Sequence, residues 1–345
     1  MHGLHKIIIL LHIVFIAGCG SGLGGLLDEE SSLCQVPVFR TGQTISYVYG
    51  DDGYYQKGAP WPSPRFESLG SGTVRDNMTG LIWGEGVVVP SSSWSLALSS
   101  AAAVTMGGYN DWRVPNRFEL QSFFHYGESS QVTWLKPPFL NTLVDSEHLT
   151  STVSAQDSVN IWACVFDENK ITTFNSGSGF NVRVVRGSSK VIPVTGQTVS
   201  YATGDDGYYQ EGVPWPVPRF VANGNGTITD KLTGLMWEQS PPGSPSESWG
   251  DAIAYAESLV LGGHGDWRVP NVNELTTLIH CGESNIAAWL NTQGFSLIEG
   301  VSCWTSTTRS NDDTVAFHID MISGGMSYTV KTDGSLYVLS VRGGQ

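Results

Sequence analysis

The chain has 345 residues, of which 40% are hydrophobic and 14% charged, with 41 Gly and 16 Pro. This composition is too apolar for a disordered chain and indicates a globular protein with many turns, long enough for two ordinary domains. The formal net charge of −14 argues against a nucleic-acid partner, because binding to the phosphate backbone requires clustered Lys and Arg.

The first residues have the features of an export signal. Lys6 precedes an apolar segment, residues 7–17, that is shorter than the roughly 20 residues of a membrane-spanning helix. Small residues then lead to Cys19, which resembles the lipidated cysteine of a bacterial lipobox; an ordinary signal peptide with a chance cysteine is the alternative. We expect a signal peptide at residues 1–18 and a lipidated tether at residues 19–40. The anchor predicts a protein of the bacterial cell envelope, at the outer membrane or cell surface.

Four cysteines remain after Cys19, and an even number in an exported protein favours two disulfides. Cys281 and Cys303 lie in the same half of the chain, so we favour a bridge between them and a second one between Cys34 and Cys164. No Cys/His cluster has the spacing of a zinc site. The sequence therefore predicts no metal and no cofactor.

A domain-length segment occurs twice in the chain. "TGQTISYVYGDDGYYQKGAPWPSPRF" at residues 41–66 returns as "TGQTVSYATGDDGYYQEGVPWPVPRF" at residues 195–220, and the correspondence continues at a spacing of 154 or 155 residues. A repeat this long is a duplicated domain, since solenoid units have about 20–50 residues. We expect two tandem homologous domains, residues 41–187 and 195–345, each an α+β unit with few helices and many short strands.

Local signals repeat in both copies. Gly-Asp-Asp-Gly is typical of a tight turn, and the Tyr-Tyr that follows it favours a strand. The adjacent aspartates, such as Asp51 and Asp52, also suggest calcium, but two carboxylates fall short of the six to eight or so oxygens that calcium prefers, so we favour a turn. Trp94, Ala97 and Leu98 have helical spacing, as do their equivalents in the second copy.

The hexapeptide DWRVPN occurs in both copies and is either a site signature or a folding signal. Asn116 is followed three residues later by Glu119, and Asn271 by Glu274, which is the Asn-x-x-Glu form of a capping box. His125 and a glycine follow where such a helix would end, and a cation there would interact favourably with the helix dipole. We interpret the motif as the start of a helix.

Together these motifs resemble those of one family. Gly-Asp-Asp-Gly-Tyr-Tyr, Pro-Arg-Phe, Asp-x-x-Thr-Gly-Leu-x-Trp, Asp-Trp-Arg-Val-Pro-Asn-x-x-Glu-Leu, Trp-Thr-Ser-Thr-Thr and the closing Val-Arg-Gly are similar to the Lcl C-terminal domain family, over nearly all of the chain after residue 40. The resemblance implies an envelope protein, often a lipoprotein, with an arrangement similar to C-type-lectin-like domains. The family is named for a bacterial collagen-like adhesin, and for that protein the resemblance implies attachment to sulfated glycans. It implies no enzymatic activity and no settled binding residues.

Two features depart from the family pattern. The acidic charge of this chain opposes binding to sulfated glycans. The first copy also has Leu149 where the second has Trp304, the first residue of the Trp-Thr-Ser-Thr-Thr motif. The first unit has therefore either lost the function of this motif or repacked the residues around it.

Ten of the twelve tryptophans stand at equivalent positions in the two copies, which favours core packing over sugar-binding platforms. Trp61 and Trp215 lie between prolines and are the best candidates for exposed ligand-binding faces. His125 and Glu128 are the best acid–base pair, although a histidine near a helix end is more often a dipole partner. Arg113 is expected to form a buried ion pair or to stack on a ring.

These observations predict a membrane-anchored binding or adhesion protein that recognises a glycan or protein ligand through loops of two tandem domains, without enzymatic activity. One alternative is a lectin-like-fold enzyme related to sulfatase-activating oxidases, which would need reactive cysteines. Another is a purely structural envelope component. No nucleophile elbow, His-Glu-x-x-His motif or phosphate loop occurs in the sequence.

Overall fold

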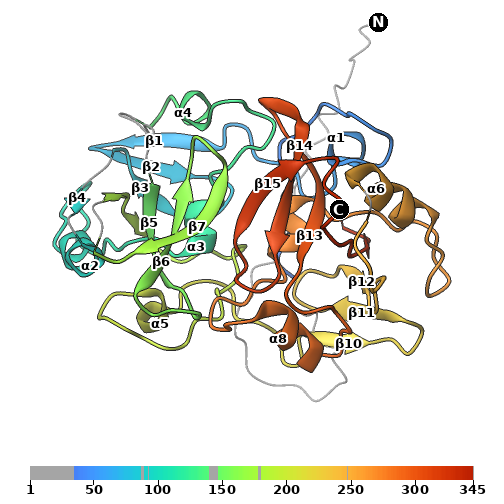
Figure 1. Ribbon diagram of the computed structural model, residues 1–345. Helices are drawn as coiled ribbons and strands as arrows, with labels where there is room; N and C mark the ends of the chain where they lie inside the picture. The colour runs from blue at the N-terminus through green and yellow to red at the C-terminus, as the bar shows by residue number, and fades with distance from the viewer. Residues whose placement is uncertain are drawn as a thin grey trace, which may run out of the picture. The chain divides into compact units, whose positions relative to one another are not determined.

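The computed structural model describes residues 35–86, 89–91, 93–139, 147–177, 180–246 and 248–344. Residues 35–345 form one compact unit with mixed α and β structure (Figure 1). The lipidation candidate Cys19 and the disulfide candidate Cys34 lie outside the described residues. We call the two copies of the duplicated sequence repeat 1 and repeat 2.

The helices are short, and each begins after a polar side chain that accepts a backbone hydrogen bond. The longest two occur where helical spacing predicts them: α2 (Trp94–Ala102) and α6 (Trp249–Ser258). The others are α1 (Asp52–Tyr55), α3 (Arg117–Gln121), α4 (Gln131–Trp134), α5 (Asp206–Tyr209), α7 (Val272–Thr276) and α8 (Ile286–Thr292). The Tyr-Tyr pairs, predicted to start strands, end the helical turns α1 and α5 instead, because the preceding aspartate caps each turn.

Each repeat has a small antiparallel sheet of four strands, in the order β1-β2-β3-β9 and β10-β11-β12-β16. In repeat 1 the strands are β1 (Phe66–Gly70), β2 (Thr73–Asp76), β3 (Ile82–Gly84) and β9 (Val185–Arg186). In repeat 2 they are β10 (Phe220–Ala222), β11 (Thr227–Asp230), β12 (Met236–Glu238) and β16 (Val341–Arg342).

A third sheet continues through both repeats, in the order β13-β14-β15-β7-β6-β5-β8-β4. Repeat 1 contributes β4 (Val89–Ser91), β5 (Glu147–Val153), β6 (Asn160–Val165), β7 (Lys170–Asn175) and β8 (Phe180–Val182). Repeat 2 contributes β13 (Ser302–Arg309), β14 (Asp312–Asp320) and β15 (Met326–Val330).

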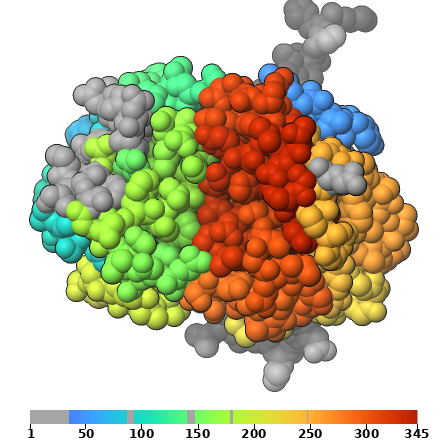
Figure 2. Space-filling view, viewed as in Figure 1, coloured from blue at the N-terminus to red at the C-terminus, as the bar shows by residue number. Residues whose placement is uncertain are grey.

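The repeats meet where β7 pairs with β15. Ile171 is opposite Met326 in this antiparallel pair, and the two residues are equivalent positions of the duplication. Gln121 and Thr276 are also equivalent, and the Gln121 amide donates to the Thr276 hydroxyl at 3.2 Å. Contacts between equivalent residues place a local two-fold axis at the junction. Figure 2 shows the green surface of repeat 1 adjoining the red surface of repeat 2 along it.

The largest apolar core draws side chains from both repeats, and each repeat adds a smaller cluster under α2 or α6. Three of the five equivalent tryptophan pairs are buried, as core packing predicts: Trp83 and Trp237, Trp94 and Trp249, Trp112 and Trp267. The shared core makes the duplicated halves one packed body.

The predicted bridge between Cys281 and Cys303 is absent, since both thiols are free and buried. Cys281 lies in the loop after α7 and Cys303 on β13, where each fills apolar core space. Cys164 is also free and buried on β6. The even number of cysteines therefore suggested a Cys281–Cys303 bridge that the fold does not form.

Candidate functional site

Two segments, which we call arm 1 (residues 41–57) and arm 2 (residues 195–211), cross from one repeat to the other. Arm 1 starts against its own repeat, where the Thr41 carbonyl accepts from the Tyr126 amide at 2.8 Å. It then reaches repeat 2, where the side-chain amide of Gln43 donates to the Thr308 carbonyl at 2.8 Å and accepts from the Thr308 N–H at 3.1 Å. In Figure 1, α1 of arm 1 (blue) accordingly lies beside α6 of repeat 2 (orange).

A buried aspartate fixes each arm to the opposite repeat. One carboxylate oxygen of Asp52 accepts from the hydroxyls of Thr41 in its own arm and Thr307 on β13, both at 2.7 Å. Asp206 of arm 2 accepts in the same way from Thr195, at 2.6 Å, and from Thr152 on β5, at 2.7 Å. Burial raises the pKa of both aspartates to about 7, while the threonine hydroxyls oppose that shift.

The preceding aspartate shapes the turn. Asp51 accepts from the backbone amides of Tyr47, Val48 and Tyr54, at 2.6 to 3.2 Å. Backbone donors therefore occupy the Asp51 carboxylate, as expected if Gly-Asp-Asp-Gly forms a turn. In the part of the chain that the structure describes, no cluster of three or more His, Cys, Asp or Glu side chains could hold a metal ion.

The DWRVPN motif begins a helix and also holds an arm. Both predicted capping boxes are present: Asn116 accepts from the Glu119 amide, and the Glu119 carboxylate accepts from the Asn116 amide, each at 2.9 Å. Asn271 and Glu274 do the same in repeat 2. The side-chain amide of each asparagine also bonds the arm of the other repeat. Asn116 Nδ2 donates to the Glu211 carbonyl of arm 2, and Asn271 Nδ2 donates to the Lys57 carbonyl of arm 1, both at 3.1 Å.

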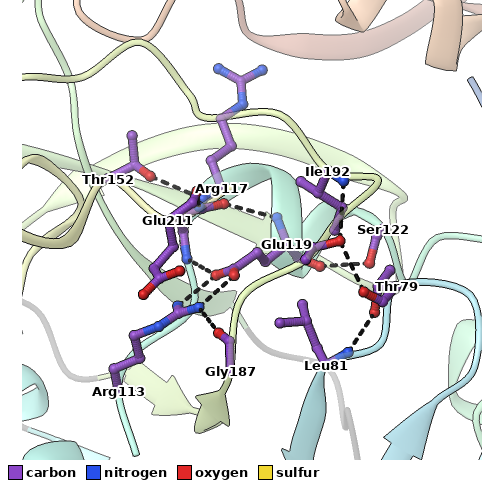
Figure 3. Close-up of polar contacts among 12 residues, drawn as sticks. Thr79, Leu81, Arg113, Arg117, Glu119, Ser122, Thr152, Gly187, Ile192 and Glu211 are labelled. Atoms are coloured by element: carbon purple, nitrogen blue, oxygen red, sulfur yellow. Dashed lines mark hydrogen bonds and ion pairs between the residues drawn. The ribbon is translucent and has the colours of Figure 1, made fainter. Parts of the chain in front are cut away.

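Buried ion pairs support these helix starts. The guanidinium of Arg113 binds both oxygens of Glu119, at 2.6 and 2.7 Å, and also the Gly187 carbonyl at 3.0 Å (Figure 3). Arg268 and Glu274 repeat the arrangement at 2.5 and 2.6 Å. The glutamate carboxylate therefore accepts hydrogen bonds from the helix-capping asparagine and from the arginine together. The charged groups of this motif thus stabilise the fold.

The arms present apolar side chains to solvent. Of the fifteen exposed large hydrophobic side chains among the described residues, eight lie on the two arms. Tyr54 is 50% exposed and its equivalent Tyr208 is 56% exposed, and each contacts the next tyrosine edge-on with ring centroids 5.1 Å apart. Exposed tyrosines on a rigid turn are typical of binding surfaces, since the ring offers contact area at low entropic cost. The sequence pattern predicted that these rings start a strand and gave no sign of their exposure.

The two tryptophan candidates are half-buried in equivalent aromatic clusters. The Trp61 ring contacts His125 and Trp134 at centroid distances of 4.7 and 5.4 Å, and the Arg65 guanidinium lies 4.7 Å from it. Trp215 has the same neighbours in repeat 2: His280, Trp289 and Arg219. The structure does not bring the two candidates together.

His125 is not the cationic helix terminus that its position suggested, because α3 ends at Gln121, four residues earlier. Burial, and then the charge of Arg65, lower the pKa of His125 to about 4, so the ring is neutral at pH 7. Its Nδ1 accepts from the Gly127 amide at 3.2 Å. The histidine is a neutral packing element of the tryptophan cluster.

Trp61 also lines an apolar hollow of about 120 Å³ between the repeats. Phe39, Phe118 and Ile192 face the same space. The polar groups at its edge bond within the protein: Asn273 donates to the Phe39 carbonyl at 3.0 Å, and the Ser122 carbonyl accepts from Arg65 at 2.5 Å. The hollow is therefore suited to an apolar group.

The described thiols are far from the reactive state. Burial raises the pKa of Cys281 and Cys303 to about 12, and raises that of Cys164 as well. A thiol with so high a pKa carries almost no thiolate at neutral pH. These cysteines act as small core side chains.

Two stretches of the chain, residues 72–186 and 226–342, match the family model of the Lcl C-terminal domain. The chain belongs to this family. No curated protein matches it. Arm 1 precedes the first matched stretch and arm 2 lies between the two stretches, so the arms that cross between the Lcl domains are segments outside the family match. Among the described residues, no helix has the length and apolarity needed to cross a membrane.

Proposed function

We propose that this tandem Lcl protein is a lipid-anchored binding or adhesion protein of the bacterial cell envelope, at the outer membrane or cell surface. The observation that carries the proposal is the concentration of exposed tyrosines on the two arms. The ligand is an extracellular or envelope glycan or protein, contacted by the tyrosine faces. Because the arms are equivalent, two ligand copies can be held at once, which raises avidity without new contacts.

Several features make the arms suitable scaffolds. Tyr54 and Tyr208 lie within capped helical turns whose buried aspartates are bonded to both repeats, so little freedom remains to be lost on binding. The oxidase-like enzyme alternative requires accessible, reactive thiols, and the burial of Cys164, Cys281 and Cys303 gives it no support. The net charge of −14 favours neutral or basic ligands over sulfated ones.

The test is a glycan and matrix-protein array probed with the full mature chain. We expect hits for the unaltered protein and at least about a tenfold loss for the double variant Tyr54→Ser, Tyr208→Ser, since central tyrosines often carry 2 kcal/mol or more of binding energy. Val260→Ser is the matched control, because Val260 is 77% exposed and lies outside both arms. Unchanged binding by the tyrosine variant would refute the role of the arms. An empty array with well-folded protein would favour a structural role.

A further inference from the structure

A second hollow, of about 200 Å³, lies between arm 2, the loop after α7 and the end of β5. We call it the His280 hollow. Gln197 and Tyr201 of arm 2 line one side, and His280, Cys281 and Glu283 of the loop line another. Its volume is several times the roughly 30 Å³ share of one water molecule in the liquid, so a small ligand fits.

The equivalent place in the other half of the molecule is bridged. There the Ser310 hydroxyl donates to the Glu128 carbonyl at 2.7 Å and ties the end of β13 to the loop after α3. Ala155 stands at the position equivalent to Ser310 and lines the His280 hollow, but has no hydroxyl to make this bond with the Glu283 carbonyl. The Ser310 bond therefore has no counterpart at Ala155, and the neighbouring Gln156 side chain joins the two segments instead by donating to the Ser284 carbonyl at 3.3 Å.

The arm is also held differently at the two places. Gln43 bonds both the N–H and the carbonyl of Thr308. Gln197 accepts from the Val153 N–H at 2.8 Å, but donates to the Val199 carbonyl in its own arm at 3.1 Å. At this position arm 2 thus makes one bond to the opposite repeat where arm 1 makes two. The His280 hollow lies beside Val153, whose carbonyl does not receive the second bond.

The charges around the hollow select for a cation. Burial, and then the charge of Arg219, lower the pKa of His280 to about 4, so this ring is neutral at pH 7. Burial raises the pKa of Cys281 to about 12, so its thiol is neutral too. Glu283 is the one acidic side chain in the lining. Tyr201 is 46% exposed and adds an aromatic ring, whose face attracts cations.

From this lining we propose that the His280 hollow binds a small organic cation, a primary ammonium group that Glu283 pairs with and Tyr201 contacts. An anion would be repelled by Glu283, and an apolar molecule would remove that carboxylate from water without compensation. The acidic surface of the chain raises the local concentration of cations. The inference rests on the proposed function only in that Tyr201 belongs to arm 2.

The test uses the full mature chain, with n-butylammonium as the probe and 1-butanol as its neutral counterpart. We expect saturation-transfer NMR to detect butylammonium and to give a several-fold weaker signal for butanol. Glu283→Gln should weaken butylammonium binding by about threefold or more, the scale of one partly exposed ion pair. Ala155→Ser should weaken it as well, by restoring the bridge seen at Ser310. Glu128→Gln, the same change in the other repeat, is the matched control and should leave binding unchanged.

Equal signals for butylammonium and butanol, or an unchanged signal with Glu283→Gln, would overturn the inference, provided that melting temperatures show each variant to be folded. A free amine and a protein lysine share the ammonium chemistry, and Nα-acetyl-lysine-methylamide as a second probe distinguishes them; a preference for either one supports the site. Glu283→Gln leaves Tyr54 and Tyr208 intact, so array binding and amine binding can fail separately. The two proposals are therefore tested independently.

Discussion

The two repeats have the same arms and helix caps but different cores. Repeat 1 buries three side chains of basic residue types where repeat 2 buries apolar side chains or a thiol: Arg117, His148 and Arg183 stand at the positions equivalent to Val272, Cys303 and Leu339. Burial lowers the pKa of all three basic groups, to about 3 for His148 and about 10 for Arg183. The buried aspartates and helix caps that hold the arms are thus alike in both halves, whereas the packing behind them has diverged.

Arg117 shows what the divergence does. Its guanidinium lies 4.1 Å from the centre of the Trp162 ring and donates to the carbonyl of Gly324 in repeat 2. Within the described residues it forms no ion pair with a carboxylate, and its close neighbours include the neutral thiols of Cys164 and Cys281. Val272 makes no such link in the opposite direction. Repeat 1 therefore carries a buried cation at the junction that repeat 2 lacks.

The largest expected effect tests what the repeats share. Burial raises the pKa of Asp52 from 3.8 to about 7, so the folded chain binds more protons than the unfolded chain between these values, and stability is lost as pH rises through this window. Asp52→Asn should match the unaltered protein near pH 4 and exceed its free energy of unfolding by on the order of 3 kcal/mol at pH 8. Denaturant unfolding at the two pH values measures this difference.

Asp206→Asn is the internal control for that prediction, because the pKa of Asp206 is raised to the same value by the same cause. The two single variants should follow one pH profile. A pH-independent difference between a variant and the unaltered protein would contradict the raised pKa of that aspartate, and opposite signs for the two variants would show that the arms are not equivalent. The neutral histidines, such as His125, titrate in the same window with the opposite sign, and comparing variants removes their contribution.

How far the sequence predicts this structure depends on the range of the interaction. The capping boxes at Asn116 and Asn271 and the helix from Trp94 were predictable because their partners lie within a few residues. The crossing of the arms was not, since a duplicated sequence does not say whether an arm packs on its own copy or on the other. The exposure of Tyr54 depends on that crossing as well and was missed with it.

A smaller effect is expected where the repeats differ. Arg117→Met should raise the free energy of unfolding by about 1 kcal/mol, because replacing a buried charge with an apolar side chain of similar length is often neutral or stabilising. The reciprocal change, Val272→Arg, should destabilise the chain by more than that, since it buries a charge in a site built for an apolar side chain. Thermal unfolding at neutral pH checks both. If Arg117→Met instead lost several kcal/mol, the bond to Gly324 would be an essential joint between the repeats.

The crossing arms and the continuous sheet make the two repeats one folded body. A protease site inserted after Ser188, which is exposed between β9 and arm 2, allows the folded chain to be cut into its two halves. Size-exclusion chromatography of the cut protein should show both halves eluting together at the position of the uncut chain, and separating only in denaturant. Halves that separate in native buffer and stay folded would contradict the account.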